Sequence, residues 1–211
     1  MGDRARQTPL QWLLTALAVA WLVTVLTIQL LGLAPADIAS SPDWVVDGRL
    51  ARLLSSSLVI DDVVPLLQYV ALAAICAAVL IRHGALIWWA ATLAGHVGSA
   101  LIAYAVIGIA IALDSNSAER AADDLDYGIS CVLAAQLGVL CLGSVQRLRA
   151  GRGSGLDRFV IVASALALVF FFVTLDWFGI EHQFAFLLGA GVLWLSERLV
   201  ARRAAGRRSM I

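Results

Sequence analysis

Six long apolar runs constrain the fold of this chain more than any other feature of its sequence. They cover residues 10–33, 63–81, 85–113, 128–145, 159–175 and 182–200. Five of them have roughly the 17–25 residues that a helix needs to cross the hydrocarbon core of a bilayer. The run at 85–113 is longer, which predicts a tilted helix or a protruding end. Because lipid offers the backbone no hydrogen-bond partners, we expect an all-α membrane protein with six transmembrane helices.

The charged residues predict how these helices are oriented. Of the 211 residues only 14% are charged, and twelve of the fifteen basic ones flank the runs on a single side. These twelve are Arg4, Arg6, Arg82, Arg147, Arg149, Arg152, Arg158, Arg198, Arg202, Arg203, Arg207 and Arg208. The positive-inside rule then places both termini in the cytoplasm. We expect a cytoplasmic N-terminus at 1–9, a membrane domain at 10–200 in the plasma membrane, and a basic cytoplasmic tail at 201–211.

Two alternative interpretations of the termini follow from the same residues. Residues 1–36 have the features of a signal peptide, with Ala34-Pro35-Ala36 as a cleavage site. However, the apolar run at 10–33 is longer than the usual stretch of about 7–15 residues. The basic tail resembles a nucleic-acid patch, but arginines directly after a span are more typical of topology anchors and lipid-headgroup contacts. We therefore expect the lipid bilayer as a partner, and no nucleic acid.

The cysteines and histidines do not form the pattern of a metal or disulfide site. Cys76, Cys131 and Cys141 all lie inside apolar runs, and an odd number of thiols in lipid predicts no disulfide framework. The three histidines are far apart along the chain. We expect no metal and no cofactor.

The two longer outer loops have different compositions. In the loop at 34–62, apolar residues recur at near-helical spacing: Trp44, Val46, Leu50, Leu53, Leu54 and Leu58. This pattern predicts a helix lying in the membrane interface, with an ordinary packed loop as the alternative. The loop at 114–126 is short and acidic. Its Asp123, Asp124 and Asp126 are candidate N-caps for the fourth transmembrane helix.

Ser130 and His182 are the candidate reactive residues. Each lies just inside the outer start of an apolar run, at matched depth. A hydroxyl and an imidazole so placed are the minimum parts of a serine nucleophile and its base. Both runs also carry small residues at helical spacing: Ser130, Ala134 and Gly138 in the fourth, and His182, Ala185 and Gly189 in the sixth. Such faces allow two membrane helices to approach closely.

These motifs resemble those of the rhomboid family of intramembrane serine proteases. Gly128-Ile129-Ser130 matches the first three positions of the family's Gly-x-Ser-Gly motif, and Gly138 matches a glycine eight residues after the serine. His182 and Gly189 match the sixth-helix pattern, with Ala185 as a small substitute. The outer loop with Trp44, Arg49 and Arg52 also suits the family. The resemblance implies a six-helix bundle, of a divergent bacterial branch, that cleaves single-span membrane proteins near their extracytoplasmic end.

The chain departs from the family pattern at several positions. Cys131 replaces the glycine after the serine, and Ala134 stands where the family often has a tyrosine. The second-helix His-xxx-Asn pattern falls on Val64 and Gln68, so Gln68 is the residue that could still bind an oxyanion. The resemblance therefore implies a catalytic Ser130–His182 dyad, with the Ser130 N–H and the Gln68 amide as oxyanion donors.

Two further functions and two further features stay open from the sequence. One alternative is a catalytically inactive rhomboid-like protein that binds transmembrane helices, and another is a small transporter or channel subunit. His96, in the third run, is expected to lie deeper than the dyad and to hydrogen-bond a neighbouring helix as a neutral side chain. Five aromatic residues are candidates for a lateral gate or for a lipid-facing belt: Phe170, Phe171, Phe172, Trp177 and Phe178.

Overall fold

The computed structural model describes residues 8–32, 38–60, 65–173 and 177–208, and almost all of them are helical. Five helices are long and apolar enough to cross a membrane. They are α1 (Pro9–Leu31), α4 (Pro65–His83), the continuous α5–α6 helix (Ala85–Ala112), α8 (Ile129–Arg149) and α10 (Trp177–Arg208). The expectation of an all-α multi-pass membrane protein is confirmed at this level. Helix α9 (Gly155–Val173) covers most of the remaining apolar run, whose last residues lie outside the described chain.

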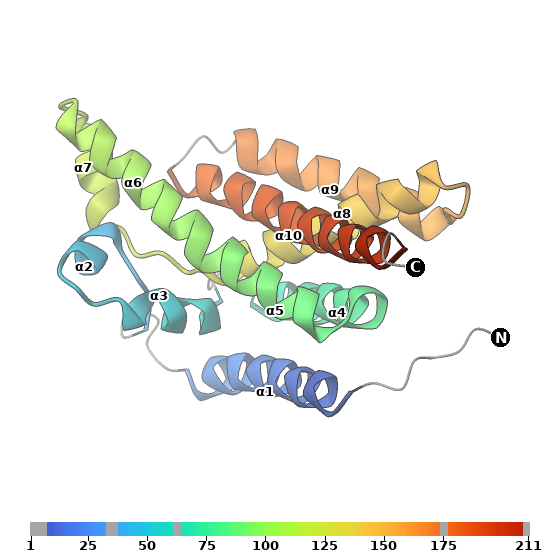
Figure 1. The fold of residues 1–211 in the computed structure, drawn as a ribbon. Coiled ribbons are helices and arrows are strands. Elements are labelled where there is room, and N and C mark those ends of the chain that lie inside the picture. The colour runs from blue at the N-terminus through green and yellow to red at the C-terminus, as the bar shows by residue number, and fades with distance from the viewer. Residues whose placement is uncertain (1–7, 33–37, 61–64, 174–176, 209–211) are drawn as a thin grey trace.

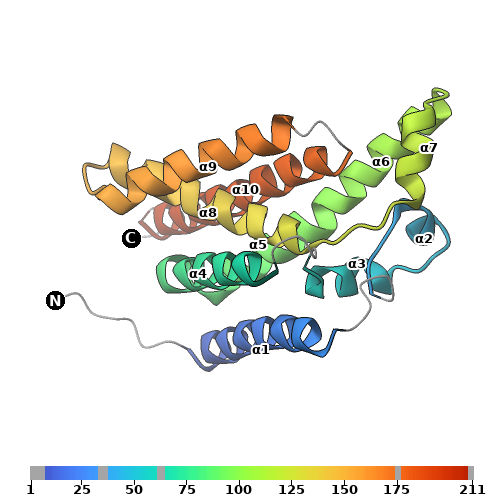
Figure 2. The ribbon, with the colours of Figure 1, turned by 180° about the vertical axis from the view of Figure 1, so that it is seen from behind.

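The third run forms one helix with a π-helical insertion. Helix α5 (Ala85–Leu93) continues through the π segment η3 (Ala94–Gly98) into α6 (Ser99–Ala112). A π-bulge adds a residue to one turn and is frequently found at functional sites. Helix α6 extends past the starts of α8 and α10 and meets the short helix α7 (Asn116–Asp123), as Figures 1 and 2 show.

Helix α8 lies at the centre of the bundle and α1 at its edge. Of the five candidate spans α8 is the most buried and α1 the least buried. Helix α8 packs against α4, α5, α9 and α10, whereas α1 lies along α4 and α5 (Figure 1). The Trp89 indole N–H donates to the Leu14 carbonyl at 2.9 Å, and Trp21 meets Trp88 edge-on at 5.5 Å between ring centroids. The remaining surface of α1 is apolar and exposed, as a lipid-facing helix requires.

Glycines bring α8 and α10 into close contact. A Cβ atom on Gly138 would overlap the backbone carbonyl of Phe186, and one on Gly189 would overlap the carbonyl of Ala135. Side by side with them, Ala134 and Ala185 are fully buried. Van der Waals contact of this kind is the main attraction between helices in lipid, where burial of apolar surface gains little.

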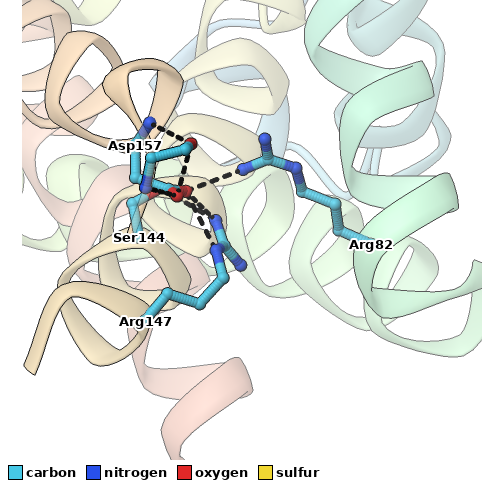
Figure 3. A network of polar contacts seen from close by, with 5 residues as sticks. Arg82, Ser144, Arg147 and Asp157 are labelled. Atoms are coloured by element: carbon cyan, nitrogen blue, oxygen red, sulfur yellow. Dashed lines mark hydrogen bonds and ion pairs between the residues drawn. The ribbon is translucent and has the colours of Figure 1, made fainter. Parts of the chain in front are cut away.

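A charged network joins three helices at the opposite end of the bundle from α7. Asp157, in the first turn of α9, accepts hydrogen bonds from Arg147 of α8 at 2.5 and 2.9 Å and from Arg82 of α4 at 3.3 Å (Figure 3). Ser144 and Ser154 donate to the same carboxylate at 3.1 and 2.8 Å. The start of α1 and the end of α10 lie at this end too (Figure 1). The arginine-rich turns of the described chain are therefore gathered on one side.

The described part of the loop at 34–62, residues 38–60, contains short helical pieces rather than one helix. Helix α2 (Pro42–Val46) and helix α3 (Ala51–Ser55) are separated at Gly48, whose φ of 82° is left-handed, and η2 (Ser56–Leu58) follows α3. The Arg52 guanidinium lies 4.5 Å from the centroid of the Trp44 ring and ties the two pieces together. Leu53 is buried, while Val46, Leu50 and Leu54 are exposed.

The prediction that an aspartate caps the start of the fourth transmembrane helix is wrong. Residues 116–123 form α7, which Ser115 caps, and α8 begins only after Gly128, which has no capping side chain. Asp126 is buried instead, because its backbone pairs with Ser40 through bonds of 2.8 and 3.2 Å. This pairing turns the Asp126 carboxyl inward and away from the start of α8.

The glycine contact between α8 and α10 gives a matched pair of variants. Gly189→Ala puts a methyl group against the Ala135 backbone, and we expect it to lower the free energy of unfolding by about 1–3 kcal/mol. Gly191→Ala, on the same helix with open space around it, should leave stability unchanged or slightly higher. Denaturation in detergent micelles measures both, and equal stability of the two variants would contradict the close contact.

Candidate functional site

The structure brings Ser130 and His182 into direct contact. Ser130 lies in the first turn of α8 and His182 in the second turn of α10. The Ser130 Oγ is 2.6 Å from the His182 Nε2, and both side chains are half-buried. The Ser130 hydroxyl is also 3.3 Å from the Tyr127 carbonyl. This is the geometry in which an imidazole accepts the proton of a serine nucleophile.

Gln68 shares a cavity with Ser130. The cavity has a volume of about 150 Å³ and lies between the first turns of α4 and α8. Its walls are otherwise apolar and consist of Ile60, Leu72, Ile129 and Leu133. Val64, the other residue that aligns with the second-helix pattern, lies outside the described residues. Gln68 thus lines the same space as the serine hydroxyl and has an amide group to offer there.

The start of α8 adds backbone donors to this cavity. The first N–H groups of a helix have no carbonyl partner within the helix, and the helix dipole makes that end electropositive. Ser130 is the second residue of α8, so its N–H belongs to this set. An oxygen atom that becomes negatively charged beside Ser130 Oγ would meet the Ser130 N–H and the Gln68 amide.

A second contact joins α8 and α10 directly beside the dyad. Cys131, which follows Ser130, donates through Sγ to Oε1 of Glu181 at 3.1 Å, and Glu181 precedes His182. The Ser99 hydroxyl of α6 donates to the same oxygen at 3.3 Å. Glu181 is only 1% exposed. The sequence analysis did not single out Glu181, although its position one residue before His182 places it close to the dyad.

Asp126 belongs to the same buried cluster. It accepts a hydrogen bond of 2.6 Å from the Tyr104 hydroxyl, and its carboxyl interacts with that of Glu181. Burial raises the pKa of Asp126 to about 6, although the Tyr104 hydrogen bond acts to lower it. No feature of the local sequence separates a capping aspartate from a buried one, so this role was missed.

His96 lies at the level of Gly128, and the expectation of a deeper position is wrong. A Cβ atom on Gly128 would overlap the His96 ring, so the ring fills the space beneath this glycine. The His96 Nε2 contacts the Leu53 carbonyl and lies 3.3 Å from the Ser56 hydroxyl. His96 lies in the π segment η3, at the point where α5 passes into α6. His96 thereby joins the outer loop to the turn that precedes Ser130.

The aromatic residues near the end of α9 take different positions. Phe172 lines an apolar groove of about 380 Å³ between α9 and α10, together with Leu168, Val169, Gln183 and Leu187. Trp177 packs instead against Ile107 and the alanines of α7. The side chains of Phe171 and Phe178 lie outside the described part of the structure, and Phe170 is exposed on the surface of α9.

Within the described residues no three histidine, cysteine, aspartate or glutamate side chains form a group that could hold a metal ion. The carboxyl groups of Asp126 and Glu181 contact hydroxyl and thiol donors.

No protein-family profile, curated protein or solved structure matches this chain in the comparisons.

The contact between His96 and Gly128 is testable by a double-mutant cycle. Gly128→Ala forces the His96 ring to move, and we expect it to cost about 1–3 kcal/mol of unfolding free energy. His96→Ala removes the ring and makes room for the new methyl group. The double variant should therefore be more stable than the sum of the single effects by about 0.5–3 kcal/mol. Strict additivity in chemical denaturation would show that the two residues do not touch.

Proposed function

We propose that this chain is a rhomboid-like intramembrane serine protease of a bacterial plasma membrane. It cleaves single-span membrane proteins near their extracytoplasmic end with a Ser130–His182 dyad. The observation that carries the proposal is the 2.6 Å contact between Ser130 Oγ and His182 Nε2 at the starts of two apolar helices. Chance placement of these two side chains in one membrane protein is common, but direct contact beside helix N-terminal donors is the arrangement that nucleophilic catalysis needs.

The reaction follows from the positions of four groups. His182 takes the hydroxyl proton as Ser130 Oγ attacks the carbonyl carbon of the scissile peptide bond. The carbonyl oxygen gains negative charge and accepts hydrogen bonds from the Ser130 N–H and the Gln68 amide. His182 then protonates the departing amine, which leaves an acyl-enzyme on Ser130. His182 then takes a proton from a water molecule, whose oxygen attacks the ester carbonyl. The bond to Ser130 Oγ breaks, and His182 gives its proton to this oxygen.

The proposed topology has six spans, with α9 as the fifth, and both termini in the cytoplasm. The arginine-rich turns around Arg82 and Arg147 lie at one end of the bundle, and the dyad lies at the other. Positive residues favour the cytoplasmic side of a membrane. The dyad therefore faces the extracytoplasmic side, from which water reaches the half-buried Ser130 and His182.

A specific observation supports the alternative of a catalytically inactive, helix-binding protein. The groove between α9 and α10 is apolar and open to the surface, and Gln183, the residue after His182, is part of its lining. A transmembrane helix that docks there makes contact without any chemistry. Cys131, in place of the glycine found in active rhomboid proteases, also suits this alternative. A wild-type protein that binds a transmembrane helix but does not cleave it would favour this alternative over the protease.

Labelling with a fluorophosphonate probe tests the dyad directly. The purified wild-type protein should react with the probe and should cleave a model single-span substrate. Ser130→Ala should abolish both signals and His182→Ala should reduce them by at least about 10²-fold, since the nucleophile then lacks its base. Ser196→Ala, which changes a serine of α10 whose hydroxyl bonds the Leu193 carbonyl, is the matched control. Labelling that survives Ser130→Ala would refute the proposal and favour the helix-binding alternative.

The role of Gln68 has its own test. Gln68→Leu keeps the volume of the side chain but removes its amide, and we expect kcat to fall about 10²- to 10³-fold. KM should change little, because the oxyanion forms only in the transition state. Steady-state cleavage of the model substrate separates the two constants. An effect confined to KM would assign Gln68 to substrate binding instead.

A further inference from the structure

Two carboxyl groups lie buried against each other directly beneath the dyad. Asp126 is 4% exposed and Glu181 is 1% exposed, and the two carboxyl groups interact with each other. Oε2 of Glu181 is buried and no donor of the described residues bonds to it. Asp126 lies four residues before Ser130, and Glu181 lies one residue before His182. Each acid is thus attached to the turn that presents one member of the dyad.

The side chains that donate hydrogen bonds to this pair, among the described residues, carry a hydroxyl or a thiol group and no positive charge. Tyr104 of α6 donates to Asp126, while Ser99 of α6 and Cys131 of α8 donate to Glu181. Two ionised carboxylates in contact inside a protein repel each other strongly, and a single proton between them replaces this repulsion with a hydrogen bond. The other titratable groups on the elements packed around the pair are Tyr104, His96, Cys131 and His182.

The contacts of the pair assign the proton to Glu181. Asp126 belongs to the outer loop segment and accepts the short Tyr104 hydrogen bond, which favours its ionised form. Glu181 lies within the apolar part of α10 and donates the shared proton to Asp126. Its other oxygen, Oε1, remains the acceptor for Cys131 and Ser99.

This arrangement holds α10 against α8 at two adjacent positions. Ser130 meets His182, and the next residue, Cys131, meets the preceding residue, Glu181. Neighbouring residues of a helix point about 100° apart. A pair of contacts at such an angle resists rotation of α10 about its axis, which one contact alone does not. The cysteine in place of the family's glycine provides the second contact.

We propose that Asp126 and Glu181 share one proton and that this acid pair is the positioning unit that holds His182 against Ser130. The positioning role rests on the proposed serine protease function. The shared proton is a property of the fold and does not depend on that function.

Infrared spectroscopy of the purified protein tests the shared proton without any need for activity. At neutral pH the wild type should show the C=O band of a protonated carboxylic acid. Glu181→Gln should remove this band, while Glu119→Gln, at an exposed acid of α7, should leave it in place. A wild-type spectrum that lacks the band, or a band that persists in Glu181→Gln, overturns the proposal.

Probe labelling across a pH series tests the positioning role. Glu181→Gln mimics the protonated acid, so its labelling rate at neutral pH should stay within about threefold of wild type, whereas Glu181→Ala should lose at least about tenfold. Wild-type labelling should fall at alkaline pH as the shared proton is lost, and the fall should be absent in Glu181→Gln. The Glu181→Gln profile decides the matter even if Glu181→Ala does not fold.

The outcomes separate the two proposals. If the wild type labels but Glu181→Ala labels equally fast, or if both pH profiles coincide, the positioning role is wrong and the protease proposal stands. If the wild type shows the infrared band but never labels, the protease proposal is wrong and the positioning role falls with it. The expected result for both is a wild type that labels, with a band that Glu181→Gln removes.

Discussion

The close contact between α8 and α10 is the interaction on which the rest of this structure depends. Gly138 and Gly189 lie against backbone carbonyl groups of the opposite helix. A side chain at either position would overlap these carbonyl groups and push the two helices apart. Because lipid does not drive helices together as water does, dispersion contacts between backbones supply much of the attraction. The contact also sets the spacing of the two helix starts. The packing of α8 against α10 therefore brings Ser130 and His182 into contact.

The polar groups of the third span explain how that contact stays in one register. Buried polar groups in an apolar bundle are costly unless they are hydrogen-bonded, so each bond made by the third span favours one arrangement over others. Gln136, fully buried on α8, donates to the Trp88 carbonyl at 2.9 Å and to the Thr92 hydroxyl at 2.7 Å. His96 and Ser99 continue this line outward to the loop and to α10. The third span thus serves as a scaffold for both helices of the dyad.

The site combines an accessible reactive pair with an inaccessible polar layer. Ser130 and His182 are half-buried beside a small apolar cavity, whereas Asp126 and Glu181 are almost completely shielded. The first pair is partly open to solvent, and the second pair is covered by Tyr104, Ser99 and Cys131. Such layering suits catalysis, because positioning groups that solvent does not reach keep their geometry through the reaction. In the helix-binding alternative the same layer only stabilises the ends of the helices.

The amino-acid sequence by itself determined the membrane class, the approximate helix bounds and the pairing of Ser130 with His182 as candidates. Hydropathy and residue spacing are local properties of the sequence, and lipid allows only helices for apolar runs of this kind. These features could therefore be predicted without the structure. The glycine and alanine spacing also indicated which faces of the fourth and sixth runs would pack. Only the tertiary structure decided that Asp126 turns inward, that Glu181 meets Cys131 and that His96 fills the space under Gly128. These contacts join residues 22 or more positions apart. Which distant groups meet depends on helix register and rotation, and no local pattern records these.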